Sequence, residues 1–91
     1  MDQAKQRDYN YTMLRTHLKN TNQHLDNNLF KTVLYAINAI TIYNKTIPEA
    51  FRMSINKYNL EYDHFATLKQ ILYRMFDSKG NVKEVLNNEQ L

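Results

Sequence analysis

Three histidines are the side chains of this 91-residue chain best suited to hold a metal ion. His17 and His24 lie seven residues apart, but the polar stretch NTNQH separates them, and His64 is far along the chain. None of these spacings matches HExxH or another zinc-binding pattern. The chain also has no cysteine, which excludes thiolate ligands, disulfides and a thiol nucleophile. We therefore predict no metal site, and we expect the histidines to face solvent or to cap helices.

A hydroxyl nucleophile with a base would require a serine beside a histidine and an acid. Ser54 or Ser78 could in principle combine with Asp63-His64, but no strained nucleophile turn surrounds either serine. Glu61 and Asp63 stand where a helix is expected to begin, and negative charge there complements the helix dipole. The sequence thus predicts capping carboxylates, no catalytic residues, no cofactor and no enzymatic activity.

Charge and hydropathy predict a soluble, cytoplasmic protein. The N-terminus, MDQAKQRDYNY, lacks the apolar core of a secretion signal. The longest apolar stretch, VLYAINAITIY, is broken by Asn38 and Thr41 and is shorter than the ~20 residues that a spanning helix needs. The formal net charge of +3 comes from the first half of the chain. This mild bias favours an anionic membrane face or nucleic acid as a neighbour.

Aromatic residues are numerous, with seven tyrosines and four phenylalanines. One group resembles a nucleic-acid contact, because basic and aromatic residues alternate in it, but no recognition motif follows: Arg7, Tyr9, Tyr11 and Arg15. Other tyrosines fall on or beside apolar faces: Tyr35, Tyr43, Tyr58, Tyr62 and Tyr73. Their rings are expected to line the edge of the core with the hydroxyl in water, or to form a contact surface.

Apolar residues recur at helical spacing in four segments, which are predicted as helices at 4–19, 27–44, 47–58 and 61–77, followed by a tail at 81–91. Asp26 is a predicted N-cap, and Thr46 with Glu49 forms a predicted capping box. Asn59 and Gly80 suit the left-handed conformation that ends a helix. With one glycine and one proline in the chain, the composition argues against a β-sandwich or barrel, which needs frequent turns.

The apolar faces predict how these segments pack. In the first segment the apolar positions are Ala4, Tyr11, Leu14 and Leu18. The second segment is apolar on nearly all sides and is predicted to be the most buried. The exception is a narrow solvent-facing stripe formed by Lys31, Asn38 and Lys45. Short connections favour an all-α, single-domain, antiparallel four-helix bundle with a short C-terminal tail. The alternative is a three-helix core with a loosely attached first helix. Val82, Val85 and Leu86 predict one or two helical turns in the tail.

Several short elements between Leu25 and Met75 follow one another in a recognisable order. They are Leu25-Asp26-Asn27, Lys31-Thr32-Val33-Leu34, Ile47-Pro48, Arg52-Met53 with Ile55, and Tyr62 with Leu68-Lys69. In these elements, in length and in helix order, the chain resembles the immunity proteins of pediocin-like (class IIa) bacteriocins. Members of that family often end in an aromatic tail, whereas this chain ends NNEQL, and its connection 56–60 is shorter than in some members.

The resemblance implies a cytoplasmic four-helix bundle at the inner face of the membrane, without enzymatic activity. It implies protection of the producing cell at the mannose phosphotransferase permease, the membrane receptor that the bacteriocin uses. The C-terminal half of such proteins is thought to decide which bacteriocin is resisted. We accordingly expect partner-binding residues on the third and fourth helices, with the tail completing the surface: Arg52, Lys57, Tyr62, Lys69, Tyr73 and Arg74.

Two other functions fit the same sequence. One is a small phage or plasmid helical regulator that binds nucleic acid or a regulatory protein. The other is an antitoxin-like bundle, which would need a toxin as its partner. Salt dependence separates the first from an immunity protein, because binding to phosphates weakens steeply as salt rises.

Overall fold

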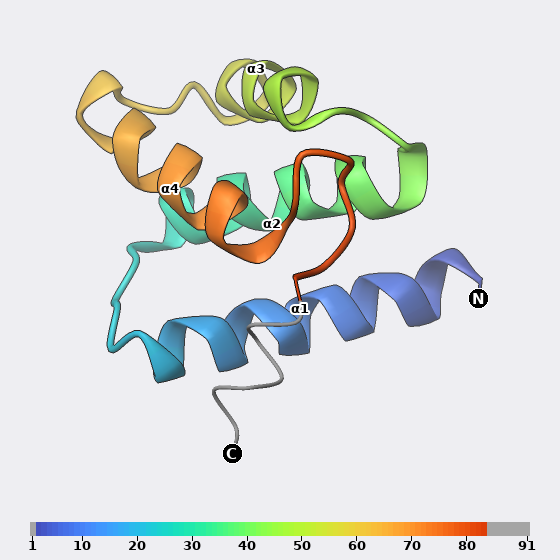
Figure 1. Ribbon diagram of the computed structural model, residues 1–91. Coiled ribbons are helices and arrows are strands. Elements are labelled where there is room, and N and C mark those ends of the chain that lie inside the picture. Colours follow the sequence, from blue (N-terminus) through green and yellow to red (C-terminus); the bar gives the residue numbers. More distant parts are fainter. Residues whose placement is uncertain (1, 84–91) are drawn as a thin grey trace.

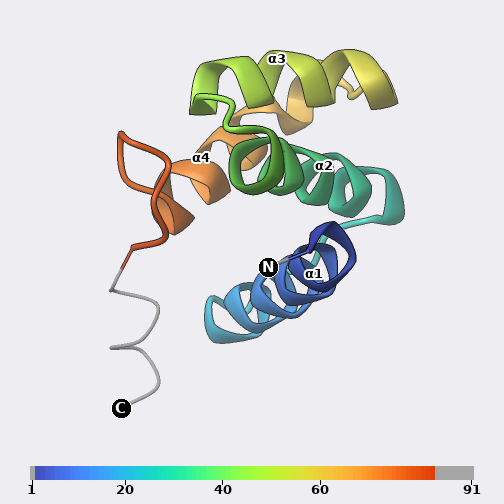
Figure 2. The same cartoon turned by 90° about the vertical axis from the view of Figure 1, so that its right-hand side faces the viewer.

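The computed structural model describes residues 2–83, which form four α-helices and one short 3-10 helix. Their order is α1 (Gln3–Asn20), α2 (Asn27–Tyr43), α3 (Ile47–Tyr58), η1 (Tyr62–His64) and α4 (Phe65–Met75). Consecutive α-helices run in opposite directions, and α2 lies between α1 on one side and α3 with α4 on the other (Figures 1 and 2). The predicted all-α four-helix bundle is confirmed.

Side-chain caps fix the start of each of the first three helices. The carboxylate of Asp26 accepts a hydrogen bond from the Leu29 N–H at 2.8 Å, as predicted. Asp2 does the same for the Lys5 N–H, so α1 begins one residue before the predicted boundary. At α3, the Thr46 hydroxyl accepts from the Glu49 N–H, and the Glu49 carboxylate accepts from the Thr46 N–H at 2.9 Å. The predicted capping box is therefore confirmed.

The carboxylate of Glu49 is stabilised by its role in this box. The hydrogen bond from the Thr46 backbone N–H, and then the one from its hydroxyl, lowers the pKa of Glu49 below its ordinary value of 4.5. A group whose pKa falls on folding stabilises the fold above its unfolded pKa and loses this effect as the pH decreases. We therefore expect the contribution of Glu49 to be complete at neutral pH and to be lost progressively as the pH falls from 4.5 through the lower pKa of the folded state.

Replacing Thr46 by alanine is expected to lower the free energy of unfolding by about 1 kcal/mol, because one N–H in the first turn of α3 loses its acceptor. Urea denaturation followed by circular dichroism measures this loss. Thr16→Ala is the control, because Thr16 is an exposed residue within α1 that caps no helix. Equal midpoints for wild type and Thr46→Ala would contradict the capping role.

Two of the helices end at asparagines in the left-handed conformation. Asn59 has φ 49°, as its predicted role at the end of α3 requires, and Asn44 ends α2 with φ 56°. Asn22 takes the same conformation in the turn after α1. A short polar amide tolerates this region of backbone space better than most side chains do.

The core is centred on α2, which confirms that this helix is the most buried. Val33, Ala36 and Ile37 are fully buried there. The other helices contribute to the same cluster: Leu14 and Leu18 from α1, Ile47 and Ala50 from α3, and Leu68, Ile71, Leu72 and Met75 from α4. Since Leu14 has no exposed surface, α1 is part of the core and is not loosely attached.

The buried face of α1 differs from the predicted one. It consists of Asn10, Leu14, His17 and Leu18, whereas Ala4 and Tyr11 are exposed. His17 retains only 2% of its surface, so the expectation that it faces solvent or caps a helix is wrong. Its position three residues after Leu14 places it on the inward side of the helix. The spacing of the apolar residues alone had predicted a buried face that lies closer to Tyr11.

The fourth helix is shorter than the predicted 61–77. It starts with one 3-10 turn and ends at Met75, after which Phe76 is extended and pairs with Val82 in an antiparallel bridge. Asp77 begins the intervening turn: its carboxylate accepts from the Lys79 and Asn81 N–H groups. Such local bonds compete with helix formation. Gly80, with φ 85°, closes this turn and does not end the helix as predicted.

The predicted helical tail is wrong for its first member, because Val82 belongs to the bridge. Val85 and Leu86 lie outside the described residues. The hairpin at 76–82 is fixed to α4 by two bonds from Lys83: its N–H donates to the Met75 carbonyl at 3.0 Å, and its Nζ donates to the Tyr73 carbonyl.

Candidate functional site

A groove of about 220 Å³ lies between α3 and α4 and holds several of the predicted contact residues. Ile47, Pro48, Phe51 and Arg52 line it from α3, and Lys69 and Tyr73 line it from α4. The capping box at Thr46 fixes where α3 starts, and Ile47 packs into the core. One helical turn after Pro48, Arg52 stands exposed at the groove.

A row of aromatic rings extends this groove towards the connection between α3 and α4. The rings of Phe51 and Phe65 pack edge to face with centroids 5.8 Å apart. The ring of Tyr62 lies 5.3 Å from that of Phe65 and is 81% exposed. Exposed aromatic residues beside arginine are typical of surfaces that bind other macromolecules.

The chemistry that this groove offers most plainly is binding through hydrogen-bond donors. Its polar lining groups are the guanidinium of Arg52, the ammonium of Lys69 and the hydroxyl of Tyr73, all of which donate hydrogen bonds. None of the lining residues is a carboxylate, a histidine or a serine. Its volume is below the ~300–1,000 Å³ of typical small-molecule pockets. The groove is therefore best suited to receive an acceptor-bearing side chain of a larger partner.

The structure brings together three of the six predicted contact residues and places a fourth near them. Arg52, Lys69 and Tyr73 share the groove, and Tyr62 stands at the end of the aromatic row. Lys57 is exposed on α3 but lies five residues after Arg52, which rotates it by about 140° around the helix. Arg74 is exposed and is rotated from Lys69 by the same angle. Lys57 and Arg74 are therefore not part of the groove.

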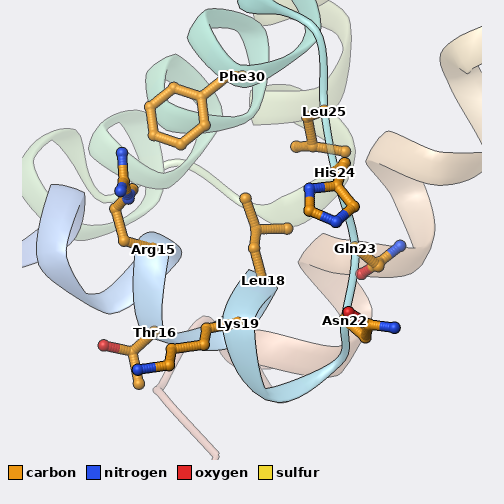
Figure 3. A pocket seen from close by; sticks show the side chains of 9 residues that line it. All are labelled: Arg15, Thr16, Leu18, Lys19, Asn22, Gln23, His24, Leu25 and Phe30. Carbon is orange, nitrogen blue, oxygen red and sulfur yellow. The ribbon is translucent and has the colours of Figure 1, made fainter.

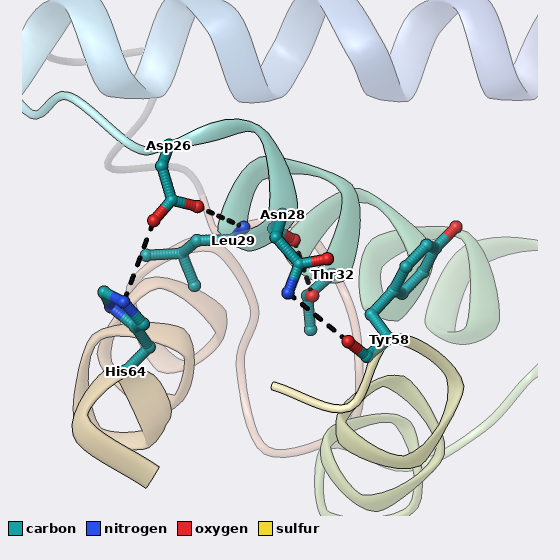
Figure 4. Close-up of polar contacts among 6 residues, drawn as sticks. All are labelled: Asp26, Asn28, Leu29, Thr32, Tyr58 and His64. Atoms are coloured by element: carbon teal, nitrogen blue, oxygen red, sulfur yellow. Dashed lines mark hydrogen bonds and ion pairs between the residues drawn. The ribbon is translucent and has the colours of Figure 1, made fainter. Parts of the chain in front are cut away.

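Polar contacts hold η1 and the end of α3 against the start of α2 (Figure 4). The Asn28 side chain donates to the Tyr58 carbonyl at 3.3 Å. Asp26, besides capping α2, lies 3.8 Å from the His64 imidazole. Glu61 and Asp63 occupy the start of η1, as predicted, but neither side chain caps it with a hydrogen bond. This junction fixes the position from which Tyr62 projects.

The Asp26–His64 contact is the one contact within 4 Å between an acidic and a basic side chain in residues 2–83. Most carboxylates of this part are at helix starts or in the hairpin turn, where they accept from backbone N–H groups: Asp2, Asp26, Glu49 and Asp77. The lysines and arginines are left without carboxylate partners there.

The serine and histidine combination considered above is not assembled. Ser54 is fully buried, and its hydroxyl donates to the Phe51 carbonyl at 3.0 Å. Ser78 lies in the exposed hairpin turn. Among residues 2–83 no cluster of three potential metal ligands occurs, and no helix in that range is long and apolar enough to cross a membrane.

A larger groove of about 580 Å³, which no pattern in the sequence predicted, lies between the end of α1 and the start of α2. Figure 3 shows Phe30, Leu25 and Leu18 among the side chains that line this groove, with Thr16 and Lys19 further along α1. Tyr11 packs edge to face on Phe30 at 5.6 Å, and the Arg15 guanidinium lies beside the Tyr11 ring. Tyr11 and Arg15, which belong to the group of residues that resembles a nucleic-acid contact, therefore contact other side chains of the fold.

Comparison of the chain with protein-family models, with curated proteins and with solved structures found no match.

Proposed function

We propose that this protein is a non-catalytic immunity protein of the pediocin-like type, which protects its cell by contacting a membrane receptor complex from the cytoplasmic side. The partner implied by the resemblance is the mannose phosphotransferase permease with its bound bacteriocin. The proposal rests on the order of short elements between Leu25 and Met75 and on the four-helix fold that accompanies them.

The observation that supports a contact role most directly is the cationic and aromatic surface formed by α3, η1 and α4. Arg52, Lys69 and Tyr73 lie in one groove without a carboxylate, and the exposed Tyr62 ends the row of aromatic rings that starts in the groove at Phe51. A few aromatic and arginine residues commonly supply most of an interface's binding energy, at ~2 kcal/mol or more each. The α3–α4 groove is therefore the part of the fold that we assign to the partner.

Reversing both charges in this groove, with Arg52→Glu and Lys69→Glu, is expected to abolish protection, because like charges would then face the acidic or acceptor groups of the partner. Sensitive cells expressing each variant would be titrated with a panel of pediocin-like bacteriocins. We expect the wild-type chain to raise the inhibitory concentration of one or a few of them and the double variant to raise none.

The matched control is Lys57→Glu with Arg74→Glu, which makes the same change in charge on exposed faces outside the groove. Circular dichroism of the purified variants establishes that each is folded. Loss of protection in the control and retention in the groove variant would move the contact surface elsewhere on α3 and α4. Sensitivity of wild-type-expressing cells to every bacteriocin would reject the immunity function.

A nucleic-acid-binding regulator is the second candidate, and one feature of α1 favours it. Arg7, Arg15 and Lys19 recur at multiples of four residues along this helix and have no carboxylate partner within residues 2–83. Binding to duplex DNA would be measured across a salt series. A steep linear decrease of log K with log salt, which the triple change of these residues to glutamine flattens, would support this function instead.

A further inference from the structure

A third groove, of about 490 Å³, lies where the end of α2 meets α1 and α3. Its volume falls within the ~300–1,000 Å³ of small-molecule sites. It combines apolar walls with polar groups that can all donate hydrogen bonds, and none of its lining residues is acidic: Arg7, Tyr35, Asn38, Ala39, Tyr43, Lys45 and Met53. Neither the immunity function nor the α3–α4 groove involves these residues.

The polar group deepest in this groove is the amide of Asn38, which is 9% exposed. The sequence placed Asn38 on a solvent-facing stripe, but a hydrogen bond at 2.8 Å from Asn10 Nδ2 to its Oδ1 holds it inside. Asn10 lies on the buried face of α1, 28 residues away in the chain. The oxygen of the Asn38 amide therefore receives its hydrogen bond from another helix.

The hydrogen bonds of Thr41 determine how the side-chain amides of Asn10 and Asn38 are oriented. The Thr41 hydroxyl donates to the Ile37 carbonyl at 3.0 Å, so it must accept from Asn10 Nδ2, which lies 2.7 Å away. The same Nδ2 donates its other hydrogen to Asn38, which therefore presents its oxygen to Asn10. The Asn38 Nδ2 group makes no hydrogen bond within residues 2–83 and is left to donate into the groove that Asn38 lines.

Two further donors at the groove are held in place. Arg7 Nη2 donates to the Tyr43 hydroxyl oxygen at 2.9 Å, which leaves the Tyr43 O–H able to donate elsewhere. Lys45 adds an ammonium to the lining. Lys45 also lies close enough to Glu49 to lower its pKa, but that carboxylate accepts hydrogen bonds within the capping box. The groove thus offers an amide, a guanidinium, a hydroxyl and an ammonium.

These donors select an anion of low charge. The groove lies beside the C-terminal end of α2, where the negative end of the helix dipole opposes any anion, and opposes a dianion such as phosphate more strongly than a singly charged group. A carboxylate carries one charge, and its planar pair of oxygens matches the guanidinium and amide donors. Tyr35, Ala39 and Met53 supply apolar surface for the remainder of a ligand.

We propose that the groove lined by Arg7, Asn38, Tyr43 and Lys45 binds a carboxylate attached to an apolar body, through the Asn38 amide and the Arg7 guanidinium. Such a carboxylate belongs either to a small organic acid or to the C-terminus of a peptide. Both sources present the same chemistry to the groove, so the test includes one probe of each kind.

The test is a titration of the isotope-labelled protein with phenylbutyrate and with a short phenylalanine-terminated peptide, followed by proton–nitrogen NMR spectra. We expect at least one of them to shift the Asn38 side-chain amide signal. The uncharged counterparts, phenylbutyramide and the amidated peptide, are expected to bind at least about tenfold more weakly, because they lose the charge-assisted hydrogen bonds. The probe that binds identifies the source of the carboxylate.

Asn38→Asp is the decisive variant, because it keeps an oxygen for Asn10 but turns a carboxylate towards the groove. We expect binding to weaken at least about tenfold. Arg7→Gln, at an exposed residue, serves the same purpose if Asn38→Asp does not fold. Lys31→Glu is the control on the exposed side of α2, outside the groove. Equal affinity for the acids and their amides, or no shift with any probe, would overturn the proposal.

Discussion

Replacing Phe76 by alanine is expected to lower the free energy of unfolding by about 3–5 kcal/mol. The Phe76 side chain has no exposed surface and belongs to the same core as Leu72 and Met75, although its backbone has already left α4. Removing the ring leaves a cavity that the surrounding helices can fill only in part. A domain of this kind is stable by ~5–15 kcal/mol, so a large fraction of its stability would be lost.

Urea denaturation of Phe76→Ala and of wild type, followed by circular dichroism, measures this loss. Val82→Ala is the matched control, because Val82 pairs with Phe76 in the bridge but is 40% exposed. Its loss is expected to stay within the ~0.2–1 kcal/mol of a cross-strand contact. If both variants lost the same small amount, the Phe76 ring would not be part of the core.

Replacing Asn10 by leucine is expected to lower the free energy of unfolding by about 1–3 kcal/mol, which is the second of the two largest effects. Asn10 Nδ2 is the donor to the buried Oδ1 of Asn38, and a buried acceptor left without its donor loses hydration without compensation. Thr41 is affected less, because its hydroxyl retains the bond to the Ile37 carbonyl. Thermal or urea unfolding of the variant measures the change.

A double-mutant cycle with Asn38→Leu separates the hydrogen bond from other effects of the substitution. Each single variant leaves one amide unpaired, whereas the double variant removes both and is expected to be closer to wild type than the sum of the single losses. Gln6→Ala is the control, because Gln6 also bonds to Asn10 but is only partly buried, so water replaces it. Strictly additive losses in the cycle would contradict the pairing of Asn10 with Asn38.

Half of the candidate contact surface could be predicted from the sequence. Arg52, Lys69 and Tyr73 were predicted as partner-binding residues of the third and fourth helices, and they meet in one groove. Lys57 and Arg74 were predicted in the same way but lie around the helices from it. Exposure follows from the pattern along one helix, but which exposed residues meet depends on how two helices pack. The groove that we propose binds a carboxylate was missed because its deepest hydrogen-bond donor, Asn38, was predicted to face solvent.

The sequence by itself determined where α2 and α3 begin and where α3 ends. Asp26, the Thr46–Glu49 box and Asn59 act on backbone groups a few residues away, so their effects do not depend on the remainder of the fold. The apolar density of α2 likewise required that it be surrounded. Such local interactions are present in any arrangement of the helices.

Only the tertiary structure determined that four residues are buried: Asn10, His17, Asn38 and Phe76. Asn10 and Asn38 are polar residues that turn inward because they satisfy each other across 28 residues of chain. Phe76 leaves its helix because the extended backbone places its ring in the core and the turn at Asp77 satisfies the polar groups that follow. For Asn10, Asn38 and Phe76, contacts between distant segments outweigh the local preference, and helical spacing contains no information about those contacts.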